Sequence, residues 1–321
     1  MSQVRYHDTV KVLQAWDRQA NAPFDRSDWF RLLAGPGGLQ PVVVTTDAAA
    51  FPMMRGPHGL EALANWYGFR WQPLGDQHDW PVIAEALRKD GHSRIDLGGL
   101  PGEHHIAAIL AASFRAAGYA VFLSISDRNH ILPVGKRDWQ AILAGRPGRL
   151  RTTIKRKAPK LNVAIHEEYD DDIWRTFEEI YTGSWKPAEG SPDMLRAFAQ
   201  MEGKAGRLRL GIACRDDRPV AAQLWTVEGR TAWIHKLAHL PEADALSPGT
   251  ILTAALMQRV IDFDHVDLID FGTGDDGYKR HWMEAERPRY TLTALDPRTP
   301  RNWPALARNA ARRLASRPAY D

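Results

Sequence analysis

The order of secondary-structure signals between Arg207 and Gly272 constrains the fold more than any other feature of the 321-residue chain. Residues 207–240 contain three strand-like runs separated by two hairpin-length breaks, RDDRP and VEGR. A helical pattern, GTILTAALMQRVIDF, and another strand-like run, HVDLIDFG, follow. Short breaks join antiparallel strands, whereas a helix between two strands is typical of a crossover connection. The sequence therefore predicts a mixed α/β (α+β) sheet.

The rest of the chain also alternates between helical and strand-like segments. Apolar residues recur at helical spacing in some segments, whereas others are short and rich in β-branched residues. The predicted helices are 6–20, 104–120, 171–185 and 195–206, and the predicted strands are 39–47, 92–100 and 119–132.

The length of the chain indicates more than one domain, since two units of roughly 150 residues are the natural expectation. The basic segment 146–160, RPGRLRTTIKRKAPK, is the predicted seam. We therefore predict an N-terminal domain over 1–145, a C-terminal domain over 146–297 and a basic amphipathic tail over 298–321.

Composition indicates a globular enzyme-sized protein, with 44% hydrophobic and 25% charged residues. The longest apolar runs fall far short of the roughly 20 residues that span a bilayer, and the N-terminus lacks a signal-peptide pattern. These features predict a cytoplasmic protein. The single cysteine, Cys214, excludes an intramolecular disulfide or a multi-cysteine zinc site, and its alternating surroundings indicate core.

Charge is distributed unevenly despite a net charge of only +3. Segment 146–160 carries basic residues and no acid, and so does the tail from Arg298 to Arg317. Such runs form either a solvated face or a docking surface for polyanionic phosphates. Nucleic acid is not expected, because segment 146–160 lacks interleaved aromatic residues. The tail places Trp303, Leu306, Ala310 and Leu314 at helical spacing among arginines, which predicts peripheral contact with an anionic inner membrane.

An SPGT turn, Ser247, Pro248, Gly249 and Thr250, precedes the apolar helix after the third strand. The first backbone N–H groups of a helix lack intrahelical partners, and the helix dipole adds positive potential there. Gly249 would let a pyrophosphate approach the backbone, and Pro248 has no N–H to lose. An ordinary capped helix start is the alternative, because Ser and Thr are good caps.

Two histidines mark the strand TAWIHKLAHL. Strict alternation predicts Trp233, His235, Leu237 and His239 on one face, opposite Ile234, Lys236, Ala238 and Leu240. A metal site is not expected, since no third ligand has suitable spacing. A hydrogen-bonded core histidine and a catalytic histidine both remain open.

The strand HVDLID ends at Asp270 and runs into the glycine-rich loop FGTGDDGYKRHW. Strand ends beside loops often carry function in α/β folds. The loop contains Asp275, Tyr278 and Lys279. By itself such a loop could be a simple turn or part of a cation site.

Together, SPGT, DFGTGDDGYKRHW, RTTIKRKAPKL and GSWK resemble the cellulose-biosynthesis-protein-like acetyltransferase family, a GNAT branch related to FemAB-like proteins. The match is specific over about 145–290 and topological before that. The resemblance implies tandem GNAT-like units with a degenerate N-terminal one. It also implies acyl-CoA as co-substrate, bound at residues 247–250, although this turn has only one Gly where the usual acyl-CoA loop has two.

The resemblance implies roles for further residues. The third strand faces the acceptor amine in GNAT-like sites, and a protonated amine cannot attack a thioester, so His235 is the predicted base and Asp270 the alternative. Tyr278 is the predicted proton donor to the thiolate. Predicted substrate contacts are His239, Lys236, Asp275, Lys279 and Trp185.

The predicted function is an acyl-CoA-dependent N-acyltransferase that needs no metal and no covalent intermediate on Cys214. The aromatic content suggests a lipid-like amine acceptor, such as a sphingoid base in a reaction like that of bacterial ceramide synthases. An envelope sugar or amino acid amine remains open. The alternatives are a FemAB-like aminoacyl-tRNA-dependent transferase and a non-catalytic GNAT-like binding protein.

Overall fold

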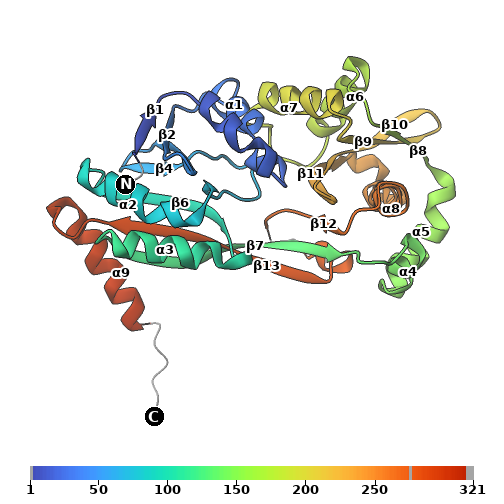
Figure 1. The fold of residues 1–321 in the computed structure, drawn as a ribbon. Helices are drawn as coiled ribbons and strands as arrows, with labels where there is room; N and C mark the ends of the chain where they lie inside the picture. The colour runs from blue at the N-terminus through green and yellow to red at the C-terminus, as the bar shows by residue number, and fades with distance from the viewer. Residues whose placement is uncertain (1–2, 275–276, 316–321) are drawn as a thin grey trace, which may run out of the picture. The chain divides into compact units, whose positions relative to one another are not determined.

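The computed structural model describes residues 3–274 and 277–315. The chain divides into two compact units: Met1–Asp127 with Arg287–Asp321 (unit 1), and Arg128–Glu286 (unit 2). Each unit is a sheet with helices, coloured along the chain in Figure 1. Within the described residues, no helix is both long and apolar enough to cross a bilayer.

Unit 1 contains strands in the order β1-β2-β3-β4-β6-β13, with β5 (Leu74–Gly75) beside β3. Neighbours are antiparallel except β4 and β6, which are parallel. The strands are β1 (Arg5–His7), β2 (Pro41–Thr45), β3 (Ala49–Arg55), β4 (Leu60–Ala62), β6 (Arg94–Pro101) and β13 (Ala285–Leu295). The helices are α1 (Ser27–Ala34), α2 (Trp80–Lys89), α3 (Ile106–Ala116) and α9 (Trp303–Ala315).

Unit 2 contains the end of β7, from Arg128, and the strands that follow it in the order β7-β12-β11-β10-β9-β8. The mixed α/β prediction is confirmed, because β8 to β11 form an antiparallel run and β11 pairs in parallel with β12. The strands are β7 (Ala120–Pro133), β8 (Asn162–His166), β9 (Leu208–Arg215), β10 (Arg218–Glu228), β11 (Thr231–His239) and β12 (Leu268–Asp270). The helices are α4 (Trp139–Ala144), α5 (Gly148–Lys157), α6 (Asp171–Thr182), α7 (Pro192–Lys204) and α8 (Pro248–Gln258).

Helices cover both faces of the unit 2 sheet, with α6 and α7 on one face and α8 on the other (Figure 1). Asp170 caps α6 by accepting hydrogen bonds from the N–H groups of Asp172 and Ile173. The apolar face of α6 is buried and contains Trp174, Phe177, Ile180 and Tyr181. On the other face, Leu252, Leu256 and Met257 of α8 pack with strand residues in a buried cluster.

Some elements differ from the sequence prediction. Residues 6–20, predicted as a helix, form the end of β1 and a 3-10 helix over Lys11–Gln19. Strands β3 and β13 were not predicted, and each contains a proline, Pro52 and Pro288. Proline is depleted in strands because it donates no ladder hydrogen bond, so tertiary pairing overrides the local signal here.

The two units do not follow the predicted domain boundaries, because strand pairing assigns two segments differently. The end of β7 pairs with β12 through Ile131–Asp270, so residues 128–145 lie in unit 2. Residues 289–295 of β13 pair with β6 in unit 1. The predicted seam at 146–160 lies within unit 2 and contains the whole of α5.

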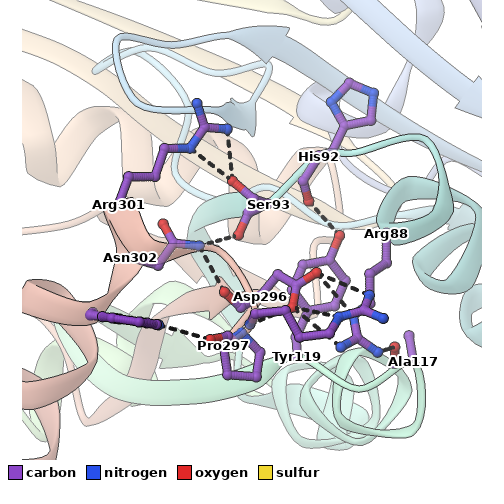
Figure 2. A network of polar contacts seen from close by, with 11 residues as sticks. Arg88, His92, Ser93, Ala117, Tyr119, Asp296, Pro297, Arg301 and Asn302 are labelled. Atoms are coloured by element: carbon purple, nitrogen blue, oxygen red, sulfur yellow. Dashed lines mark hydrogen bonds and ion pairs between the residues drawn. The ribbon is translucent and has the colours of Figure 1, made fainter.

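The start of the predicted tail is anchored in unit 1 (Figure 2). Buried Asn302 donates hydrogen bonds to the carbonyl oxygens of Ser93 at 2.8 Å and Asp296 at 3.1 Å. Asp296 in turn accepts hydrogen bonds from Arg88 and Arg298. Burial works to raise the pKa of Asp296, but the hydrogen bonds from these two arginines outweigh it and hold the pKa well below its usual value.

Candidate functional site

An opening in the unit 2 sheet separates β11 from β12. The two strands pair in parallel only from Thr231–Leu268 to Trp233–Asp270. Strand β12 ends at Asp270, whereas β11 continues to His239. In the described part of the chain no other strand pairs with this side of residues 234–239. Their backbone hydrogen-bonding groups on that side can therefore serve a ligand.

A β-bulge lies on β11 at the opening. Leu224 pairs with Lys236 and Trp225 with Ile234, so His235 is an extra residue that breaks the alternation. The prediction that His235 and His239 share one face is therefore wrong. His235 lies beside Phe198 of α7, with ring centroids 4.9 Å apart, whereas His239 lies beside the start of α8.

His235 occupies a low-polarity setting. Its Nε2 lies 2.8 Å from the Thr226 hydroxyl oxygen. Burial, with a smaller contribution from the charge of Lys236, lowers the pKa of His235 to about 3. The imidazole is therefore neutral at physiological pH, and it is a weaker base than an ordinary histidine.

The start of α8 has the character of an anion site. Ser247 adopts a left-handed conformation, with φ 51° and ψ 49°, and no side chain caps this turn. The Lys157 ammonium at the end of α5 donates a 2.8 Å hydrogen bond to the Ser247 hydroxyl. The ammonium thus lies at the residue that precedes α8, where the helix dipole and the first backbone N–H groups, those of Gly249 and Thr250, also favour an anion. The contact of Lys157 with Ser247 was not predicted, because the two residues are 90 positions apart in the sequence and only packing brings them together.

Two predicted substrate contacts, His239 and Trp185, lie together beside this helix start. Their ring centroids are 4.4 Å apart. The Nε2 of His239 lies 2.8 Å from an Asp244 carboxylate oxygen, and its Nδ1 would lie 3.3 Å from a Cβ added at Gly249. The geometry thus connects His239 with the helix start rather than with His235.

Asp270 organises the loop after β12. It is fully buried, and its carboxylate accepts hydrogen bonds from the Gly272 N–H at 2.8 Å and from the Asn129 amide at 3.2 and 3.3 Å. Both carboxylate oxygens are therefore engaged by protein donors. This arrangement favours a positioning role, in which Asp270 fixes Gly272 at φ 69°.

The remaining predicted loop residues lie around the same turn. The Lys279 ammonium donates hydrogen bonds to the carbonyl oxygens of Thr273 at 2.5 Å and Gly274 at 3.1 Å, and the side chain is buried. Tyr278 is 39% exposed, with its ring 5.5 Å from that of Phe271. Asp275 lies outside the described residues.

Lys236 borders an aromatic pocket on the α6 and α7 face. Its ammonium lies 2.7 Å from a carboxylate oxygen of Glu189 and 5.3 Å from the centroid of the Tyr181 ring. Burial, and then the charge of Glu189, raises the pKa of Tyr181 to about 12. The pocket has a volume of about 430 Å³ and is lined mainly by Trp174, Phe177, Tyr181, Pro187, Ala188 and Leu195. The aromatic face of α6 was visible in the sequence, but the pocket was not.

Asp270→Asn should lower the free energy of unfolding by about 2 kcal/mol. The amide NH₂ would face at least one of the donors that now bond the carboxylate, which leaves buried groups unsatisfied. Urea denaturation measures the change. Asp267→Asn is the matched control, because Asp267 forms an exposed ion pair with Arg230 that solvent screens, so its loss should have a much smaller effect. Equal effects of the two substitutions would contradict the positioning role.

Comparison with known proteins places this geometry in a known fold. Residues 148–280 match the family described as acetyltransferase (GNAT) domain. FemX is similar with a TM-score of 0.65 and 10% identity, over 92% of this chain and 98% of that one. The C-terminal domain of a putative lysylphosphatidylglycerol synthetase from Agrobacterium fabrum has a TM-score of 0.61 and 15% identity, over 94% and 95%.

A tandem GNAT protein from the clavulanic acid biosynthesis pathway is also similar, with a TM-score of 0.52 and 14% identity over 92% of this chain and 100% of that one. Among curated proteins, none matches the sequence. The GNAT part of the predicted resemblance and the tandem GNAT-like fold are therefore confirmed. The cellulose-biosynthesis and ceramide synthase resemblances have no support from these comparisons.

Proposed function

We propose that unit 2 transfers an acyl group from a CoA thioester to a primary amine. One observation carries this proposal: the β11–β12 pair opens directly beside an uncapped helix start that Lys157 approaches. The opening offers backbone donors to an extended amide-containing arm, and the helix start offers them to a pyrophosphate. CoA contains both an extended amide-containing arm and a pyrophosphate. The GNAT match over residues 148–280 supports this assignment.

The proposed chemistry is direct attack. The amine nitrogen bonds to the thioester carbon, the C–S bond breaks, and one amine proton ends on the departing sulfur. His235 takes this proton in transit, and its low pKa favours passing the proton on. Tyr278, partly exposed on the loop, relays this proton: its hydroxyl protonates the thiolate and is reprotonated by the proton that His235 carries. Cys214 serves no covalent step here, because burial and then the charge of Asp217 raise the pKa of its thiol.

The aromatic pocket between α6 and α7 supports an apolar acceptor. Its charged lining residues are largely compensated, since Glu189 pairs with Lys236 and Glu178 with Arg196. An apolar chain can therefore enter without leaving a buried charge unpaired. A long-chain amine, such as a sphingoid base, is the acceptor that we propose.

Mass spectrometry of reaction products tests the function. The pure protein is incubated with mixed acyl-CoAs and three amines: a sphingoid base, an amino sugar and an amino acid. We expect amide products with the sphingoid base. Absence of any amide with every donor and amine, despite a folded protein, would exclude acyl-CoA-dependent transfer.

An aminoacyl-tRNA donor is the second candidate, because five exposed basic residues extend along and beyond α5 towards the start of α8. Within the described residues, none of the five has an ion-pair partner; they are Arg149, Arg151, Lys155, Arg156 and Lys160. A polynucleotide could bind there through its phosphates. Steeply salt-dependent tRNA binding, together with aminoacyl products, would favour this donor.

Contact of α9 with an anionic membrane is also proposed. Trp303 is 58% exposed at the start of the helix, and Arg308 is exposed on it. Arg308→Gln should weaken binding to phosphatidylglycerol vesicles about fivefold, the effect of about 1 kcal/mol per basic residue near the surface. Arg115→Gln, an exposed change on α3, is the control. Vesicle co-sedimentation measures both, and equal binding by the Arg308 variant and the unmodified protein would reject the contact.

A further inference from the structure

Unit 1 contains a polar cavity that the proposed acyl transfer in unit 2 does not use. Strands β4 and β6 pair in parallel only at Leu60–Ile95 and Glu61–Asp96. Strand β4 then ends at Ala62, whereas β6 continues to Pro101. A cavity of about 500 Å³ lies here, between these strands, β3, β13 and residues 64–71. This volume suits a small-molecule ligand.

Two glycines without side chains leave free space along one wall of the cavity. Leu97 pairs with Leu292 and Leu100 with Tyr290, so Gly98 and Gly99 together oppose Thr291 in a bulge. A Cβ added at Gly98 would meet only the Thr291 hydroxyl oxygen, at 3.9 Å. A side chain there would therefore project into open space, where a ligand now has room.

The cavity lacks the anion-binding helix start of unit 2. The helix that follows β4 and β5, α2, is preceded by Asp76 and Asp79, and Asp76 already accepts a hydrogen bond from the His78 N–H. These carboxylates repel phosphate at the positive end of the helix. A second CoA-like ligand is therefore not the occupant that this unit favours.

The charges that line the cavity leave one carboxylate available. Arg94 bonds Asp96 at 2.6 Å, and Arg70 bonds both Asp25 and, at 2.7 Å, Asn21. Thr293 donates a further hydrogen bond to Asp96 at 2.7 Å. The side chain of Glu61, in contrast to its backbone, forms no hydrogen bond or ion pair with any residue that the structure describes. Arg94 and Arg70 are thus each paired with a carboxylate, Asp96 and Asp25, and Glu61 is a lining carboxylate that neither cation neutralises.

We propose that this cavity binds a small primary ammonium compound through Glu61. The Glu61 carboxylate lies against Gly56, where an added Cβ would come within 2.0 Å of its Oε1. The rigid Arg94–Asp96 and Arg70–Asp25 pairs form polar walls, and the glycine wall leaves room for an alkyl chain. The site is formed by residues of unit 1 alone, so the test of this proposal is independent of the proposed acyl transfer in unit 2.

Calorimetry with three probes of equal length tests the charge preference in the full-length protein. The probes are 1,5-diaminopentane, pentane-1,5-diol and glutarate. The diamine should bind at least tenfold more tightly than the diol, and glutarate should not bind. Equal affinity for diamine and diol would overturn the proposal.

Three variants test the location. Glu61→Gln should weaken diamine binding about tenfold, and Gly56→Ala should weaken it by displacing the carboxylate. Gly98→Leu should abolish binding by filling the cavity. Glu85→Gln, an exposed carboxylate on α2, is the control and should leave affinity unchanged. Unaltered affinity in folded Glu61→Gln and Gly98→Leu proteins would also overturn the site.

Discussion

His235→Ala should lower turnover about 100-fold and leave the affinity for acyl-CoA unchanged, whereas His239→Ala should weaken acyl-CoA binding and spare turnover. The bulge on β11 separates the two histidines, with His235 beside Phe198 and His239 beside Gly249. A positioned base contributes roughly 100-fold to 10,000-fold, and the low pKa of His235 sets our expectation at the lower end. Turnover at saturating donor and calorimetry with CoA measure the two effects.

The pH dependence of the His235 step provides a second readout. Because His235 stays neutral above about pH 3, its titration should not appear in the rate profile between pH 5 and 8. His235→Ala should therefore reduce the rate by the same factor across this range. A folded His235→Ala protein with near-unmodified turnover would remove His235 from the mechanism, and equal losses for both histidines would contradict their separation.

Gly249→Val should raise the dissociation constant of acyl-CoA about 100-fold. A branched side chain in the first turn of α8 obstructs the approach of a pyrophosphate to the backbone N–H groups, and charged hydrogen bonds of this kind contribute about 1.5–3 kcal/mol. The substitution should barely change the KM for the amine. Calorimetry with CoA measures the affinity, and circular dichroism checks the fold.

The double variant with His239→Ala separates two causes of this effect. A Cβ at position 249 would lie 3.3 Å from the His239 Nδ1, so part of the loss could arise from moving that ring. If displacement of the ring is the cause, the double variant binds CoA as well as His239→Ala alone does; if blocked phosphate approach is the cause, the double variant binds CoA more weakly than His239→Ala alone, so the loss persists. We expect persistence. Unchanged CoA affinity in folded Gly249→Val would reject the phosphate site.

Features that depend on local pattern were predictable from the sequence. The aromatic face of α6, the meander of β9 to β11 and the helix after SPGT follow from apolar periodicity and turn residues. These patterns depend on residues within a few positions of one another, so they can be recognised in the sequence without knowledge of the tertiary packing. The tandem GNAT-like fold was implied by the resemblance of the sequence motifs to a GNAT family.

Only tertiary structure decided the arrangement within the site. A bulge depends on the register between two strands, and one inserted residue changes which face each later side chain occupies; this is why strict alternation misplaced His235 relative to His239. The contact of Lys157 with Ser247 and the burial of Asp270 beneath Asn129 join residues far apart in sequence. Cross-strand register and long-range packing leave no local periodicity. The sequence by itself therefore determined the elements with a clear local pattern, whereas pairing and packing determined strands such as β3 and β13 and decided which side chains meet.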